Sequence, residues 1–242
     1  MTPLRWLAFG LLFVAAAAPA QQRLVAPGTQ PVKLDRHKLS YAIGYQIGSQ
    51  FADGEPAVDL PTMQQAIRDA FGKRPPAVSM QDMHMQLREL DRQMHTRAVA
   101  EFKHLAAVNL NKSREYMANN ARQPGVVQLP SGIQYTVIKK GSGTVSPTVT
   151  STVTVNYRGM LIDGTEFDST WARGQPVRFE VDKVISGWQD VIPRMHAGDR
   201  WKVVIPPQLA YGEHGALPRI GPNEALVFEI ELLDIKSGPD NH

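Results

Sequence analysis

The sequence predicts an α+β protein in which a helical half precedes a half made of antiparallel β-sheet and one short helix. Up to about Asn120 the apolar residues recur three and four positions apart, as they do on one face of a helix. After Asn120, β-branched and aromatic residues form short runs with period-two alternation between turns rich in Gly and Pro. The chain has 242 residues, of which 43% are hydrophobic and 20% charged, enough for one large or two modest domains.

The first segment, residues 1–20, predicts a cleaved export signal. Arg5 precedes a run of apolar and small residues at 6–18, and Ala18-Pro19-Ala20 supplies the small residues that a signal peptidase reads. The run is shorter than the roughly 20 residues that span a bilayer. We therefore expect a mature chain that begins near Gln21, with no stable membrane insertion; an uncleaved anchor is the alternative. The expected location is the periplasm, with outer-membrane association or secretion as alternatives.

Two short helices are predicted next. Residues 21–32 lack periodicity and are expected to form a flexible lead. The first helix carries apolar residues at a spacing of four, namely Leu39, Ile43, Ile47 and Phe51. Gly44 and Gly48 lie on a neighbouring stripe, where they either let another helix approach or face solvent. The second helix has Pro61 in its first turn and Gly72 after its last residue.

A third, long helix is predicted from Ser79 to about Asn120. Ser79 and Asp82 form a capping box, and no Pro interrupts the chain before Pro124. At ~1.5 Å per residue this helix is about 60 Å long. Its first half carries a heptad seam that consists of Met80, Met83, Leu87, Leu90 and Met94. Such a helix outgrows one small core, so we expect residues 33–122 to form a dimerisation domain with a stalk, or alternatively an intrachain bundle.

The second half, residues 123–236, is expected to fold as a sheet domain, followed by a tail at 237–242. The expected strands are 126–127, 133–138, 153–157, 177–181, 201–205 and 226–235. Asp163-Gly164 predicts a tight hairpin turn, and a short helix is expected near 187–195. Gly141-Ser142-Gly143 is expected to be a linker or turn, since neither a helix nor Gly-Lys-Ser follows it.

Composition and motifs exclude several classes of function. The chain has no Cys, which excludes disulfides, cysteine-ligated metals and thiol nucleophiles. Its seven His residues show no metal-binding spacing, and it contains neither a G-x-S-x-G elbow nor a G-x-G-x-x-G motif after a strand. A net charge of only +3 argues against nucleic acid as a partner. Any enzyme built on this chain is expected to work without metal, cofactor or covalent intermediate.

Three segments carry aromatic residues at strand ends and in loops. They read YRGMLIDGTEFDST from Tyr157, VISGWQDVIPRM from Val184 and PPQLAYGEHGALPRIGPNEALVFEIELLDI from Pro206. In this order they strongly resemble the FKBP family of peptidyl-prolyl isomerases over residues 126–236. The segment LSYAIGYQIGSQF from Leu39, with the long helix after it, resembles the N-terminal dimerisation region of exported bacterial FKBPs of the macrophage-infectivity-potentiator and FkpA type.

The resemblance implies an FKBP-like sheet wrapped on one helix, with a proline-binding cleft. The residues that it assigns to catalysis are Tyr157, Phe167, Asp168, Tyr211 and Phe228. Those that it assigns to substrate binding are Arg173, Val177, Val184, Ile185, Trp188 and Ile220. Trp188 would form the floor, the Ile185 N–H and the Tyr211 hydroxyl would bind substrate carbonyls, and Arg173 would orient Asp168. For each aromatic residue the alternative is plain core packing, and for the Arg–Asp pair it is a solvated turn.

This chain departs from the family pattern at the rim of the implied cleft. Val177 stands where the family often has an aromatic residue, Ala216 where some members have His, and the stretch from Phe179 to Trp188 is shorter. These departures concern the rim and the sequence preference rather than the floor. Trp171 would either add aromatic surface at that rim or cap it.

The partners implied are proline-containing unfolded or partly folded polypeptides, a second copy of the chain and FKBP-type macrolide inhibitors. The activity implied is prolyl isomerisation in exported or envelope proteins. A dimeric periplasmic chaperone with incidental isomerase activity and a catalytically silent peptide-binding module are the alternatives. Physically, an apolar aromatic cleft favours the twisted imide over the planar one, because the twisted carbonyl carries less charge and loses less on leaving water.

Overall fold

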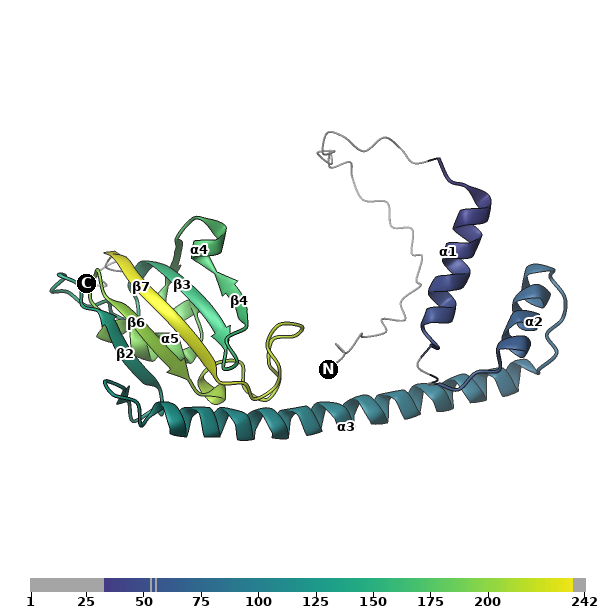
Figure 1. The fold of residues 1–242 in the computed structure, drawn as a ribbon, viewed down its shortest axis with the longest axis horizontal. Helices are drawn as coiled ribbons and strands as arrows, with labels where there is room; N and C mark the ends of the chain where they lie inside the picture. Colours follow the sequence, from purple (N-terminus) through teal and green to yellow (C-terminus); the bar gives the residue numbers. More distant parts are fainter. Residues whose placement is uncertain (1–32, 53, 55, 237–242) are drawn as a thin grey trace. The chain divides into compact units, whose positions relative to one another are not determined.

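The computed structural model describes residues 33–52, 54 and 56–236 (Figure 1). The predicted export signal, the lead at 21–32 and the tail at 237–242 lie outside the described residues. The chain forms two compact units that divide between Ala77 and Val78. Helices precede an antiparallel sheet with one short packed helix, so the predicted α+β class is confirmed.

The first unit contains helices α1 (Arg36–Ser49) and α2 (Leu60–Phe71). Asp35 caps α1 by accepting the Lys38 N–H at 3.0 Å, and Asp59 caps α2 by accepting the Thr62 N–H at 2.8 Å. Helix α1 ends at Ser49, so Phe51, which the sequence placed on the apolar face of this helix, lies in the turn that follows it.

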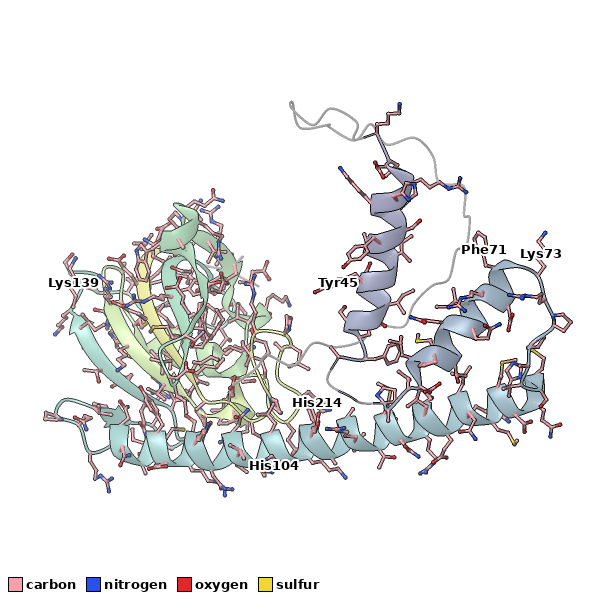
Figure 2. All side chains as sticks on the ribbon, turned by 45° about the vertical axis from the view of Figure 1, so that its right-hand side comes forward. Tyr45, Phe71, Lys73, His104, Lys139 and His214 are labelled. Atoms are coloured by element: carbon pink, nitrogen blue, oxygen red, sulfur yellow. The ribbon has the colours of Figure 1, made fainter. Side chains whose placement is uncertain are left out.

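Neither helix of the first unit buries a side chain. The exposed large apolar and aromatic residues are Leu39, Tyr41, Ile43, Tyr45, Ile47, Leu60, Ile67 and Phe71. Figure 2 shows the rings of Tyr45 on α1 and Phe71 at the end of α2 standing out from their helices, and Phe71 is 89% exposed. Apart from the backbone of α1 itself, no heavy atom of the described residues lies within 4 Å of a Cβ built on Gly44 or Gly48, so the glycine stripe has open space beside it there.

Helix α3 (Met80–Asn120) confirms the predicted long helix. Ser79 caps it by accepting the Asp82 N–H at 3.0 Å. Side chains of the heptad seam such as Met80, Leu87 and Met94 are exposed. At its C-terminal turns, in contrast, α3 buries Asn109 and Ser113 against the sheet domain, a contact that the sequence did not predict.

The sheet domain contains seven strands, all paired antiparallel. Their bounds are β1 (Val127–Gln128), β2 (Gln134–Lys139), β3 (Thr152–Leu161), β4 (Glu166–Ser169), β5 (Val177–Glu180), β6 (Arg200–Ile205) and β7 (Leu226–Lys236). Their order is β1-β2-β6-β7-β3-β4, with β5 paired to β3 off this path. The central pair β3 and β7 places Gly159 opposite Phe228 and Tyr157 opposite Ile230.

Short helical segments connect the strands. They are α4 (Thr170–Arg173), α5 (Ser186–Val191) and the 3₁₀ turns η1 (Val181–Lys183), η2 (Ile192–Arg194) and η3 (Pro207–Leu209). The predicted helix at 187–195 is therefore α5 continued by a 3₁₀ turn, because Pro193 cannot donate to an α-helical ladder. The predicted Asp163-Gly164 turn is present, with Gly164 at φ 89°.

The core lies between α5 and one face of the sheet. Trp188, Val191 and Ile192 of the α5 region pack with buried residues of β6 and β7, including Ile205 and Phe228. A Cβ on Gly187 would lie 2.4 Å from Ile205 Cγ2, so only glycine lets α5 approach β6 this closely. In the described part of the chain, no helix has the length and apolar character needed to cross a membrane.

Candidate active site

Four aromatic rings converge on Trp188 or on its neighbour Phe228. The ring centroid of Trp188 lies 5.1 Å from that of Tyr157, 5.3 Å from Phe228 and 5.4 Å from Phe179. The ring of Phe167 packs edge-on against Phe228 at 5.9 Å. These rings come from β3, β4, β5, α5 and β7. Three of the four pairs are edge-to-face, a favoured geometry for aromatic rings, and the Phe179–Trp188 pair is tilted at 46°.

A glycine on β3 makes room for two of these rings. A Cβ on Gly159 would lie 2.6 Å from Phe167 Cε2 and 3.0 Å from Phe228 Cε1. A contact of 2.6 Å does not occur between real side chains and one of 3.0 Å is tight, so any other residue at 159 would displace the Phe167 ring. Gly159 therefore sets how closely Phe167 and Phe228 approach each other across the β3–β4 and β3–β7 pairs.

The cluster has a buried layer and a partly exposed layer. Trp188, Ile220 and Phe228 are buried, whereas Tyr157, Phe167, Val184 and Ile185 are partly exposed. Within the buried layer, Trp188 contacts three other rings.

Asp168 is held by two hydrogen-bond donors beside the cluster. The Tyr157 hydroxyl donates to one carboxylate oxygen and the Arg173 guanidinium to the other. Arg173 Nη2 also lies 3.4 Å from the Tyr157 hydroxyl oxygen, with the guanidinium carbon 5.7 Å from the centre of the tyrosine ring. The predicted pairing of Arg173 with Asp168 is therefore present.

These contacts determine the charge states of the group. Partial burial raises the pKa of Asp168, but the hydrogen bonds from Tyr157 and Arg173 and the charge of Arg173 outweigh it, so this pKa lies below its ordinary value. Burial, together with the hydrogen bond to Asp168, raises the pKa of Tyr157. At neutral pH Asp168 is ionised and Tyr157 is neutral, so Asp168 has no proton to give to a substrate.

Two hydrogen-bond donors, the backbone N–H of Ile185 and the side-chain hydroxyl of Tyr211, have no acceptor in the described part of the chain. The Ile185 N–H makes no hydrogen bond, while its carbonyl accepts the N–H groups of Trp188 and Gln189. Gln189 Nε2 also fixes the preceding carbonyl, that of Val184, at 2.8 Å. Tyr211 is 40% exposed and makes neither a ring contact nor a side-chain hydrogen bond there. Both donors are free for a ligand, although Tyr211 is not in contact with the ring cluster.

Val177 and Ala216, two of the positions that depart from the family pattern, make defined contacts in the structure. Val177 is half-buried and packs against the core. Ala216 pairs with Ile220 through two backbone hydrogen bonds of 2.9 and 3.1 Å, which form a small bridge inside the 210–225 loop.

Trp171 lies on the other face of the sheet rather than at the rim. The Arg200 guanidinium carbon stands 4.9 Å from the centre of its ring. Arg200 also pairs with Glu229, which alternates with Phe228 along β7 and so faces away from the cluster.

Three contributors to the site were not predicted from the sequence. Phe179 is one of the three rings that touch Trp188. Gly159 makes room for the rings of Phe167 and Phe228. Arg219 Nη1 donates to the Phe167 carbonyl at 2.9 Å. The alternation of Val177 and Phe179 along one strand could have placed Phe179 on the core face. Nothing in the sequence signals the Arg219 contact, which joins positions 52 residues apart.

Other candidate sites do not compete with this cluster. Within the described ranges, no group of three or more His, Asp or Glu side chains could hold a metal ion. A separate surface hollow of about 420 Å³ lies between the C-terminal turns of α3 and residues 206–208, lined by Leu110, Met117, Pro206 and Pro207 among others. None of the predicted site residues lines this hollow.

Comparison with known proteins identifies the family. Residues 143–233 match the FKBP-type peptidyl-prolyl cis-trans isomerase family, and residues 36–137 match the domain amino terminal to FKBP-type peptidyl-prolyl isomerase. The chain is 39% identical to the peptidyl-prolyl cis-trans isomerase Mip of Coxiella burnetii, over 87% of this chain and 91% of that protein. It is 35% identical to the isomerase FkpA of Escherichia coli, over 93% and 84% of the two chains.

The fold agrees with a solved structure as well. The crystal structure of FkpA from Escherichia coli superposes with a TM-score of 0.69 at 36% identity and covers 86% of this chain and 99% of that one. Together with an aromatic cluster assembled from the segments that carry the family resemblance, these matches show that the chain belongs to the FKBP-type peptidyl-prolyl cis-trans isomerases.

Proposed function

We propose that this isomerase accelerates rotation about X–Pro bonds in exported or envelope proteins during their folding, and that the aromatic cluster forms its proline site. The proposed catalytic residues are Tyr157, Phe167, Asp168, Tyr211 and Phe228, and the proposed substrate-binding residues are Arg173, Val177, Val184, Ile185, Trp188 and Ile220. The observation that carries the proposal is the convergence of Tyr157 and Phe228 on the buried Trp188 ring.

The mechanism follows from the electronic structure of the imide bond. Rotation faces a barrier of ~18–20 kcal/mol because the planar form has C–N resonance. The twisted transition state loses this resonance and carries less charge on its carbonyl oxygen. An apolar ring cluster that replaces water therefore stabilises the twisted state relative to the planar one, and a difference of about 4 kcal/mol gives roughly 10³ in rate.

Polar groups at the edge of the cluster hold the substrate while it twists. The free Ile185 N–H and the Tyr211 hydroxyl donate to substrate carbonyls. Asp168 is ionised and occupied by Tyr157 and Arg173, so it fixes the Tyr157 ring against Trp188 rather than moving a proton. The reaction then needs no covalent intermediate and no cofactor.

A protease-coupled assay on Ala-Leu-Pro-Phe peptides tests the assignment of the site. Phe228→Ala and Asp168→Ala are expected to lower kcat/KM at least tenfold, because they remove a cluster ring and the anchor of Tyr157. Trp171→Ala is the matched control, since it removes an aromatic ring from the opposite face of the sheet. An FKBP-type macrolide should compete with the peptide. Full activity of Phe228→Ala, or equal losses in Trp171→Ala, would contradict the assignment.

Export and dimerisation are part of the proposal. The matched proteins include one named outer membrane protein MIP from Legionella longbeachae, 36% identical over 88% of this chain. The exposed apolar faces of α1 and α2 and the open glycine stripe support a homodimer formed through the N-terminal helices. Export is tested by mass spectrometry of the mature N-terminus, which is expected near Gln21. Dimerisation is tested by comparing the sedimentation of the wild type with that of Ile43→Lys. A monomeric wild type would refute the dimer.

A second candidate function is a holdase chaperone. The exposed Met80, Met85, Leu87 and Met94 on the first half of α3 favour it, because flexible methionine side chains adapt to varied apolar segments. If this role is separate, Phe228→Ala retains suppression of client aggregation while losing turnover. Parallel loss of both activities would reject a separate chaperone function.

A further inference from the structure

The long loop at 210–225 contains two residues that are assigned to the proposed proline site. Ile220 is buried in the same apolar cluster as Trp188 and Phe228, and Tyr211 offers a free hydroxyl. The ends of the loop are tied together, because the Asn223 N–H donates to the Gly212 carbonyl at 2.8 Å. The position of Ile220 therefore depends on what holds the segment 221–225.

Helix α3 holds this segment through two buried polar side chains. Asn109 Nδ2 donates to the Pro222 carbonyl at 2.9 Å. Ser113 Oγ donates to the Asn223 carbonyl at 2.9 Å and accepts the Ala225 N–H at 2.8 Å. Figure 1 shows the loop before β7 meeting α3. A buried polar side chain costs stability unless it is hydrogen-bonded, so both residues fit only with the loop in this position.

The clamp, by which we mean Asn109 and Ser113, fixes an unusual backbone conformation. Asn223 has φ 56°, in the left-handed region that residues other than glycine rarely adopt. Asparagine tolerates this region better than most residues, but the conformation persists only where neighbours determine it. Besides the contact from Ser113, the Asn223 side chain donates to the Ala106 carbonyl of α3 at 3.3 Å.

We propose that Asn109 and Ser113 are positioning residues for the isomerase reaction, which set substrate affinity through the 210–225 loop. Both act at a distance, because their hydrogen bonds go to loop residues 222, 223 and 225 and not to the ring cluster. The stalk helix is then a structural part of the substrate site. This inference rests on the proposed function, in which Ile220 and Tyr211 contact the substrate.

The test uses the full chain with Asn109→Ala and Ser113→Ala combined. We expect KM for a proline peptide to rise about threefold to tenfold, as for the loss of one or two hydrogen bonds of ordinary strength, with kcat within about twofold. Hydrogen exchange at the Ala225 amide should accelerate, while β6 amides exchange as in the wild type. Asn111→Ala, an exposed asparagine on the same turn of α3, is the matched control. Ser113→Thr keeps the hydroxyl and should retain a KM near that of the wild type.

If the double variant does not fold, a second variant changes the loop residue that lies against the clamp. A Cβ on Gly221 would lie 3.0 Å from Asn109 Nδ2, so Gly221→Ala should raise KM in the same direction. An unchanged KM in the folded clamp variants, a fall confined to kcat, or unchanged exchange at Ala225 would overturn the inference. The proposed function fails separately, if the wild type is inactive or Phe228→Ala is fully active.

Discussion

Gly159→Ala tests whether the spacing of the rings determines activity. The added Cβ would lie 2.6 Å from Phe167 Cε2, where ordinary carbon contacts need about 3.5 Å or more, so the Phe167 ring must move by about 1 Å. Displacements of that size in a reacting site cost up to about 10²-fold in rate. Overpacking a core costs about 1–3 kcal/mol of unfolding free energy, which in a unit of this size lowers Tm by about 3–10 °C.

The assay pairs peptide isomerisation with thermal unfolding, so that the loss of activity is separated from the loss of stability. We expect kcat/KM to fall about tenfold to a hundredfold at temperatures where the variant remains folded. Gly143→Ala is the steric control, since its Cβ would lie 2.9 Å from Ala197 backbone atoms, away from the rings. It should lower Tm comparably and leave kcat/KM nearly unchanged.

A double variant checks the cause. Phe167→Leu removes ring atoms from the clash, so in the Gly159→Ala background it should restore part of the lost stability and show strong non-additivity. If Gly159→Ala retains wild-type kcat/KM, or if Gly143→Ala loses as much, then the spacing of Phe167 and Phe228 does not control the reaction.

Four further predictions concern charges, the loop and the domain boundary. The pKa of Asp168 is lowered in the fold, so the ion pair of Asp168 stabilises the folded state at pH values above the unfolded pKa of about 3.9. This stabilisation is lost as the pH falls through the folded pKa. The difference in Tm between Asp168→Asn and the wild type should therefore shrink below about pH 4. Burial raises the pKa of Glu224, so this side chain contributes fully to stability below the unfolded pKa of about 4.3, and its contribution declines as the pH rises. In urea unfolding, Glu224→Gln should therefore be more stable than the wild type at pH 7 but not at pH 4. Arg219→Ala frees the Phe167 carbonyl, and kcat/KM should fall about twofold to fivefold; equality with wild type would dismiss that contact. A fragment starting at residue 100 keeps the clamp and should be a monomeric isomerase, whereas one starting at residue 123 should show a higher KM; a dimer in sedimentation would reassign the interface.

The sequence was informative wherever local chemistry determines structure. The Ser79 cap, Pro61 in the first turn of the second helix and the heptad spacing predicted helices that the structure contains. The ring cluster was predictable for a different reason, because the motifs around Phe167 and Trp188 resemble a family whose fold brings them together. The role of Tyr211 stays a prediction, since its side chain is 40% exposed and makes no ring contact within the described residues.

The rest of the site depends on contacts between distant segments, which leave no local pattern. Asn109 and Ser113 interrupt the apolar periodicity of α3, so from the sequence they belong to a solvent-facing stretch of a stalk. In the fold they are buried because carbonyls and an N–H of residues 222–225, more than a hundred positions away, satisfy them. A polar residue at a buried helix position is stable only with such partners, and its partners gain a fixed conformation in return. The segment 222–225 is therefore held by the helix that precedes the whole sheet, and a domain boundary drawn at the change in composition near residue 123 separates these hydrogen-bonded partners.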